Sequence, residues 1–121
     1  MPKPEREFSR PDDLPWTAVA GSAAAGAGGP GIVEKVLSRD PATGDVTRLL
    51  RFDAGVATSD TIAHDFWEEV WILEGALTDL GTQQTYTAGM YACRPPGMRH
   101  GPYVSSSGAL LFETRYRAPR A

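Results

Sequence analysis

The stretch HDFWEEVWILEG, residues 64–75, bears on both the fold and the function of this chain. Its second half is rich in Val, Ile, Leu and Trp and ends at Gly75, a composition typical of a β-strand. Because successive side chains of a strand point to opposite faces, only one of the adjacent Glu68 and Glu69 can face the interior. The stretch is either a half-buried strand with a polar start or the first half of a metal site whose second half lies elsewhere in the chain.

The sequence on both sides of this stretch continues the pattern of short strands. From Ile32 onward, segments rich in β-branched and aromatic residues are separated by turn residues at intervals of roughly eight to twelve positions. None of these segments sustains helical periodicity over about ten residues. We therefore predict an all-β fold, closed or built of two sheets, because such an arrangement protects exposed strand edges; a jelly roll is one form of it.

The length of 121 residues suits one domain. Residues 1–31 contain five prolines and the run GSAAAGAGGPG, so we predict an N-terminal arm and linker there and a β-domain over residues 32–121. Phe8 and Trp16 are apolar exceptions in the arm. They pack either on a neighbouring subunit or the barrel mouth, or on their own domain.

Composition excludes several classes of partner. The net charge is −3 with scattered lysines and arginines, so the chain has no basic stripe for nucleic acid or an anionic membrane surface. Neither a membrane-spanning apolar run nor the apolar segment of a secretory signal is present, so we expect a cytoplasmic protein without nucleic-acid or membrane partners. A lone cysteine, Cys93, cannot form an internal disulfide, and we expect it to be a small core residue.

The candidate metal ligands are the two histidines of the chain, His64 and His100, together with Glu68. His100 ends the stretch GMYACRPPGMRH, residues 89–100, in which a Pro-Pro-Gly turn precedes it. Two imidazoles and one carboxylate from separate strands are the ligands of a facial triad, which leaves other metal positions open. Such a site suits catalysis, because substrate, water or O₂ can reach the metal.

These stretches resemble the two motifs of the cupin superfamily. The first motif is H-x-H, three or four residues, E, six residues, G, and its later positions match His64, Glu68 and Gly75. The second motif is matched at full spacing by four residues, namely Gly89, Pro95, Gly97 and His100. The general sequence pattern resembles that of small single-domain cupins related to ChrR-type sensors and to dioxygenases that cleave diketones and hydroxyacetophenones.

Two positions depart from the cupin pattern. Ile62 stands where the first histidine belongs, and Val104 stands where the terminal asparagine belongs. Since both histidines of H-x-H bind metal in typical cupins, the resemblance implies a site with three protein ligands here and leaves a metal-free cupin as an alternative.

The resemblance implies a cupin jelly-roll barrel of about eight to ten short antiparallel strands. It also implies one divalent metal per chain bound by His64, Glu68 and His100, with Fe(II) favoured and zinc, manganese or nickel as alternatives. On the parity of Glu68, Val70 and Ile72 face the interior. Trp71 then faces outward with Leu73, which indicates a covered outer face; we expect a homodimer interface, with the arm as the alternative cover.

Further residues are candidates for the pocket. We predict that Tyr91 and Tyr103 bind substrate as hydrogen-bonding aromatics, with simple packing as the alternative. Strand parity places Arg94 opposite Tyr91 and Cys93, and we expect Arg94 to be solvated. The same expectation holds for Arg48 and Arg99, although any of the three would bind a substrate carboxylate if it faced inward.

Three functions follow as hypotheses. The first is a metal-dependent enzyme acting on a small carbonyl or enol molecule that chelates the metal, with dioxygenase-type C–C cleavage favoured over non-oxidative isomerisation, cyclisation or decarboxylation. The second is a module that binds or senses a metal or small ligand without turnover. The third is a metal-free cupin, acting as an epimerase-like enzyme or a carbohydrate binder.

Overall fold

The computed structural model describes residues 3–19 and 31–117 of the chain. Within them the fold is all-β, as predicted, apart from the single 3₁₀ turn η1 at Pro11–Asp13. The strands are β1 (Thr17–Ala18), β2 (Ile32–Arg39), β3 (Val46–Phe52), β4 (Val56–Ala57), β5 (Ile62–Ala63), β6 (Trp67–Asp79), β7 (Gln84–Thr87), β8 (Tyr91–Arg94), β9 (Arg99–His100), β10 (Tyr103–Ser105) and β11 (Ala109–Tyr116). The described residues thus form eleven strands, and four of these are only two residues long, too short to show in a sequence pattern.

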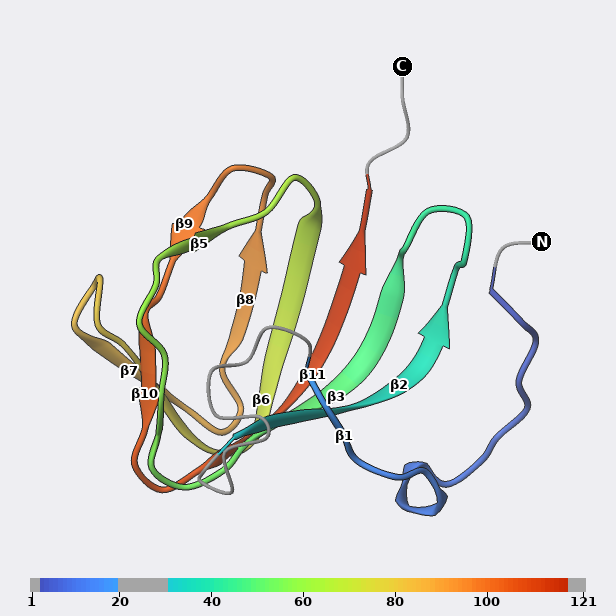
Figure 1. The fold of residues 1–121 in the computed structure, drawn as a ribbon, viewed down its shortest axis with the longest axis horizontal. Helices are drawn as coiled ribbons and strands as arrows, with labels where there is room; N and C mark the ends of the chain where they lie inside the picture. The colour runs from blue at the N-terminus through green and yellow to red at the C-terminus, as the bar shows by residue number, and fades with distance from the viewer. Residues whose placement is uncertain (1–2, 20–30, 118–121) are drawn as a thin grey trace.

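The strands form two walls that curl around an interior, as in a jelly roll (Figure 1). The first wall has the order β1-β2-β3-β11-β6, and β8 pairs with the first half of β6 on its other side. In the second wall, β7 and β10 flank the last residues of β6, β4 pairs with β10, and the short pair β5-β9 adds to this side. All pairs are antiparallel.

Strand β6 belongs to both walls and bends between them at Gly75. Its first half pairs with β11 and β8, and the residues after Gly75 pair with β7 and β10. Gly75 has φ +80°, and a Cβ there would lie 2.1 Å from the carbonyl oxygen of Gly108. Only glycine fits this bend, and the strand that the sequence pattern ended at Gly75 continues through it to Asp79.

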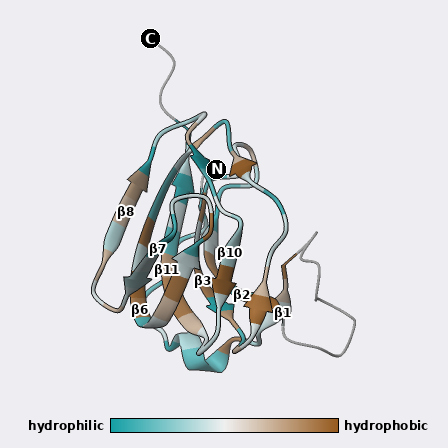
Figure 2. Ribbon diagram, turned by 90° about the vertical axis from the view of Figure 1, so that its left-hand side faces the viewer, coloured by the Kyte–Doolittle hydropathy of each residue, from teal (hydrophilic) through white to brown (hydrophobic). Residues whose placement is uncertain are grey.

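The core lies between the walls and follows strict alternation. In β3, Val46, Arg48, Leu50 and Phe52 are buried, whereas the intervening residues are partly exposed. Val70 and Ile72 of β6 are also buried, as predicted from the parity of Glu68. Hydrophobic stretches interrupted by hydrophilic ones run along the strands in Figure 2, which is the pattern of two-faced sheets.

The described part of the N-terminal arm lies against the first wall. Thr17 and Ala18 pair with β2, and Trp16 packs between Lys35 and Arg51, with Lys35 Nζ 4.7 Å and Arg51 Cζ 4.6 Å from the ring centroid. Trp16 therefore packs on its own domain, the second of the two expected arrangements, whereas Phe8 is fully exposed. Most of the Gly/Ala-rich linker, residues 20–30, lies outside the described residues.

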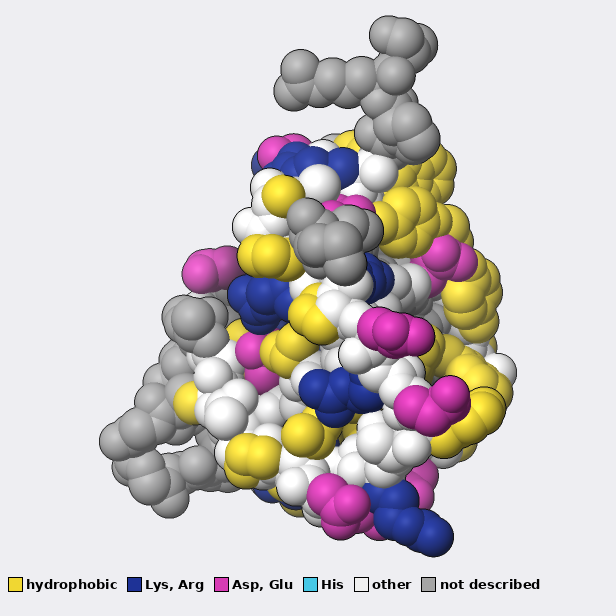
Figure 3. Space-filling model, turned by 90° about the vertical axis from the view of Figure 1, so that its right-hand side faces the viewer, with side chains coloured by type: hydrophobic (Ala, Val, Ile, Leu, Met, Phe, Trp, Pro, Cys, Tyr) yellow, Lys and Arg dark blue, Asp and Glu magenta, His cyan; other side chains and the backbone are white. Residues whose placement is uncertain are grey.

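Charged side chains of both signs lie on the surface. On the face in Figure 3, acidic and basic side chains are interspersed and hydrophobic side chains gather along its right-hand edge. No helix within residues 3–19 and 31–117 has the length and apolar character needed to cross a membrane.

Candidate metal site

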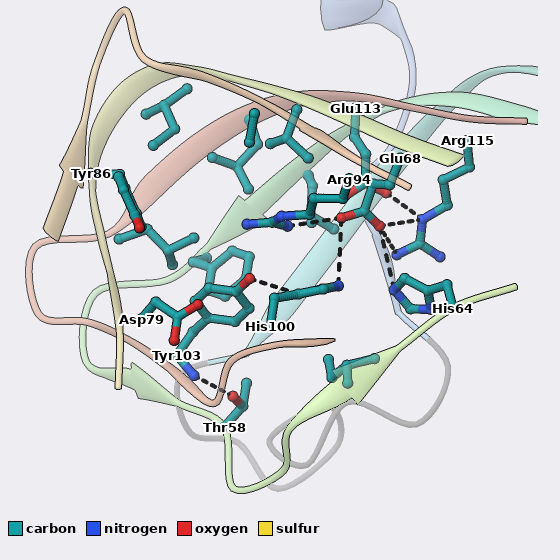
Figure 4. A pocket seen from close by; sticks show the side chains of 18 of the residues that line it. Thr58, His64, Glu68, Asp79, Tyr86, Arg94, His100, Tyr103, Glu113 and Arg115 are labelled. Atoms are coloured by element: carbon teal, nitrogen blue, oxygen red, sulfur yellow. Dashed lines mark hydrogen bonds and ion pairs between the residues drawn. The ribbon is translucent and has the colours of Figure 1, made fainter. Parts of the chain in front are cut away.

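The three predicted ligands meet in the interior. His64 lies in the loop between β5 and β6, Glu68 lies near the start of β6, and His100 lies in β9. One ligand atom from each lies within 4.8 Å of the other two. Figure 4 shows both imidazoles directed toward the Glu68 carboxylate.

The Nε2 atoms of His64 and His100, which would bind the metal, make no hydrogen bond within the described residues. His64 Nε2 lies 3.5 Å from Glu68 Oε2, and His100 Nε2 lies 4.0 Å from Glu68 Oε1, beyond hydrogen-bond distance or at its margin. Both Nε2 atoms are buried and lack a hydrogen-bond partner among the described residues. Buried polar atoms are nearly always satisfied, so two orphaned nitrogens aimed at one carboxylate fit a bound cation.

The protonation states also suit metal binding. Burial lowers the pKa of His64, and burial together with nearby Arg94 lowers the pKa of His100 to about 4. Burial alone would raise the pKa of Glu68, but Arg115 and Arg94 outweigh it and hold that pKa below its usual value. At neutral pH the site therefore offers two neutral imidazoles and a carboxylate, which are the ligand forms that a divalent metal requires.

Tyr103 fixes the orientation of His100. Its hydroxyl oxygen lies 2.7 Å from His100 Nδ1, and both side chains are buried. A histidine that binds metal through Nε2 carries its proton on Nδ1 and donates it to a neighbouring group. With metal on Nε2 the Tyr103 hydroxyl would be that acceptor, and the structure places this residue beside the ligand cluster.

Two arginines hold Glu68 in place. Arg94 Nη1 donates to Glu68 Oε1 at 2.9 Å. Arg115 Nε donates to Glu68 Oε2 at 3.0 Å, and Arg115 Nη2 forms an ion pair with the same oxygen, also at 3.0 Å. Glu68 lies directly between them in the sheet, opposite Arg94 in β8 and opposite Arg115 in β11. The carboxylate is only 2 % exposed, and these contacts balance its charge.

Ion pairs continue from this carboxylate across the first wall and form what we call the charged row. Arg115 also bonds Glu113, Glu113 bonds Arg48, and Arg48 bonds Glu34. Carboxylates and guanidinium groups thus alternate from β2 to β8. Burial raises the pKa of Glu113, and Arg48 and Arg115 oppose that rise.

A cavity of about 330 Å³ opens beside the cluster. Apolar side chains from both walls form most of its surface, including Leu50, Phe52, Ile72, Leu77 and Leu111. Polar groups converge at one end, where His64, Glu68 and His100 lie. A largely apolar cavity with a few convergent polar groups is the usual form of a small-molecule site.

Ile62 lines this cavity and pairs with His100 across β5-β9. The position of the missing motif histidine is therefore next to the cluster, but its side chain is a hydrocarbon. Within the described residues, no other His, Cys, Asp or Glu joins the group of three.

Several expectations about β8 are wrong. Cys93 is exposed on the outer face opposite Glu69, not in the core. Arg94 faces the interior with a side chain that is 14 % exposed, so it is not solvated. Tyr91 of the same strand lines the cavity, although it is 60 % exposed and its hydroxyl donates to Glu69; its role in substrate binding stays a prediction.

Arg48 is likewise buried, in contrast to its expected solvation, whereas Arg99 is exposed as expected. The inward orientation of Arg94 follows from the register between β8 and β6. An arginine directly across an antiparallel pair from an inward glutamate shares its face, but the pairing of Glu68 with Arg94 becomes known only from the structure.

Comparisons with known proteins agree with the fold and identify the family. A family model described as the ChrR cupin-like domain matches residues 4–117. An RmlC-like cupin from Shewanella frigidimarina has a similar structure, with a TM-score of 0.71 at 22% identity over 99% of this chain and 97% of that one. Among curated proteins none matches.

Two further solved structures share the fold. An acetylacetone dioxygenase from Acinetobacter johnsonii has a TM-score of 0.71 at 19% identity, covering 92% of this chain and 74% of that one. The polyketide cyclase RemF from Streptomyces resistomycificus has a TM-score of 0.67 at 16% identity, covering 95% and 83% of the two chains.

Proposed function

The chain belongs to the family of ChrR cupin-like domains, and from this we propose that it is a metal-dependent cupin enzyme acting on a small molecule that chelates the metal through carbonyl or enol oxygens. The proposed reaction is dioxygenase-type cleavage of a C–C bond. The observation that carries the proposal is the pair of orphaned, buried Nε2 atoms of His64 and His100 at the Glu68 carboxylate.

The protein would hold the metal with His64, Glu68 and His100. A divalent ion bound there supplies Lewis acidity and, if it is Fe(II), the redox chemistry needed to use O₂. Three protein ligands leave positions for a chelating substrate. The similarity to the acetylacetone dioxygenase from Acinetobacter johnsonii supports the oxidative reaction.

The other side chains prepare the site for such chemistry. Tyr103 orients the ring of His100 through its contact with Nδ1, while Arg94 and Arg115 hold the Glu68 carboxylate. The apolar walls of the cavity exclude water from one side of the substrate.

The proposal is tested by O₂ consumption with pentane-2,4-dione and with hydroxyacetophenones. We expect uptake by the Fe(II)-loaded protein and none by the zinc-loaded protein. Glu68→Gln should abolish uptake, whereas Glu74→Gln, which neutralises an exposed carboxylate of the same strand, should preserve it.

Other outcomes would replace this function by a named alternative. Turnover under argon would indicate non-oxidative chemistry, for which the similarity to the polyketide cyclase RemF is a precedent in fold. Stoichiometric binding of metal and dione without turnover of either kind would indicate a binding or sensing module.

A further inference from the structure

We propose that the ligand of this site carries a carboxylate and that Arg94 binds it. The inference rests on the proposed metal-dependent function and narrows its substrate class to small organic acids such as 2-oxo acids. Three features of the interior support it, namely the unused donors of Arg94, the charge balance around the metal ligands and the position of Arg94 in the cavity.

Arg94 is the interior arginine with donors to spare. A guanidinium group has five N–H donors. Arg48 donates to Glu34 and Glu113, and Arg115 donates to Glu68 and forms an ion pair with Glu113, so each of the two contacts two carboxylates. Arg94 makes one hydrogen bond among the described residues, from Nη1 to Glu68. Its remaining donors match the two oxygens of a further carboxylate.

The charge balance favours an anion once metal is bound. The ion-paired row together with buried Asp79 contains three arginines and four carboxylates, namely Arg48, Arg94, Arg115, Glu34, Glu68, Asp79 and Glu113, and the exposed Arg99 also lines the cavity. A divalent ion changes this group from one net negative charge to one net positive charge. Uncompensated charge in a buried site is costly, and a monoanionic ligand removes it. The raised pKa of Glu113 can only increase the positive balance.

The position of Arg94 suits a ligand that also reaches the metal. Arg94 lines the cavity, and its Cζ lies 5.7 Å from the centroid of the Tyr103 ring. Figure 4 shows its guanidinium group beside Glu68, on the side of the carboxylate that faces Tyr103. A molecule that bridges the metal and Arg94 would therefore rest on the apolar walls of the same cavity.

The remaining polar groups near this end do not offer a second anion site. Asp79 is an anion whose oxygens already accept from the backbone N–H groups of Gly81, Thr82 and Gly101. Arg115 is engaged with two carboxylates. Among the arginines that line the cavity and lie in the ion-paired row, Arg94 is thus the one that pairs with a single carboxylate, while the exposed Arg99 also lines the cavity.

The test compares two probes that differ in one group. The probes are 2-oxobutanoate and pentane-2,3-dione, in which a methyl group replaces one carboxylate oxygen. Binding to the Mn(II)-loaded protein is measured by calorimetry under argon, and bound Mn(II) is measured separately by electron paramagnetic resonance. We expect 2-oxobutanoate to bind at least about tenfold more tightly than the dione, which corresponds to about 1.4 kcal/mol.

Variants identify the residue responsible. Arg94→Gln should remove the tenfold preference; because Arg94 also contacts the metal ligand Glu68, the two probes are compared within the variant at equal Mn(II) occupancy. Arg94→Lys should keep part of the preference because the charge remains without the planar fork. Arg51→Gln is the matched control, since it removes an arginine from the outer face beside Trp16 and should leave the preference intact.

Failure of the inference is distinguishable from failure of the proposed function. If Mn(II) binds but the probes bind equally, or Arg94→Gln keeps the preference, the inference is overturned while the metal site stands. If Mn(II) does not bind, the metal-dependent function fails. In that case an Arg94-dependent preference for 2-oxobutanoate in the metal-free protein still supports the anion site, and its absence overturns it.

Discussion

The Nδ1 atom of His100 lies 2.7 Å from the hydroxyl oxygen of Tyr103, and this buried contact fixes which ring nitrogen faces Glu68. We expect Tyr103→Phe to weaken metal binding by about 10- to 100-fold, because the contact that orients the ligand is lost while the ring packing remains. Metal affinity is measured by competition with a chelator of known affinity. Tyr86→Phe removes another hydroxyl from the same cavity and should leave affinity unchanged; equal affinity in both variants would remove Tyr103 from this role.

Ile62 offers a gain-of-function test. Its side chain lines the cavity and its backbone pairs with His100, so Ile62→His places a third imidazole, and thus a fourth candidate ligand, at the motif position next to the cluster. We expect metal affinity to rise at least about tenfold, or about 1.4 kcal/mol. Ile32→His, which introduces a histidine elsewhere in the same cavity, is the control. Unchanged affinity in Ile62→His would mean that this position does not reach the metal.

The metal-free protein should lose stability on acidification. Burial lowers the pKa of His100 to about 4, compared with about 6.5 in an unfolded chain. Between these values the unfolded state binds more protons, so the free energy of unfolding rises with pH. We expect urea unfolding to show stability falling as pH decreases from about 6.5 to about 4, with no further loss from this group below. His100→Gln should flatten that dependence, and an identical slope in both proteins would contradict the assignment.

The outer face of the first wall is the proposed homodimer interface. Trp71 is 50 % exposed there, and with Glu69, Tyr91, Phe112 and Thr114 it lines a hollow of about 340 Å³. We expect the protein to sediment as a dimer at micromolar concentration and Trp71→Lys to shift it toward the monomer, because a charge would be buried. Leu80→Lys, at an exposed apolar residue after β6, should remain dimeric. A monomeric wild-type protein would reject the interface.

Much of the fold and the position of the ligand cluster could be predicted from the sequence, because both depend on local patterns. Motif spacing selected His64, Glu68 and His100, and the structure brings them within 4.8 Å. Alternation along β6 correctly placed Val70 and Ile72 inside and Trp71 outside. The placement of these β6 side chains needs only the two-residue alternation of a strand and one residue, Glu68, whose face is known.

The charged row could not be predicted in the same way. In β8 and β11 the residue types do not reveal which face is inside, because buried arginines and glutamates compensate one another across strands. Residue type predicts that Cys93 lies in the core and that Arg94 is solvated. The register with β6 places Cys93 on the outer face and Arg94 in the interior. The bend at Gly75 was also missed, since it depends on the close approach of Gly108.

The central claim is that His64, Glu68 and His100 bind one metal ion. Its most direct test is the metal content per chain of the untagged protein, measured by elemental mass spectrometry after expression with iron, zinc, manganese or nickel. We predict close to one metal ion per chain, iron above all, and its loss in alanine variants of each ligand that retain a β circular dichroism spectrum. Absence of metal under every condition, or unchanged content in the variants, would contradict the account.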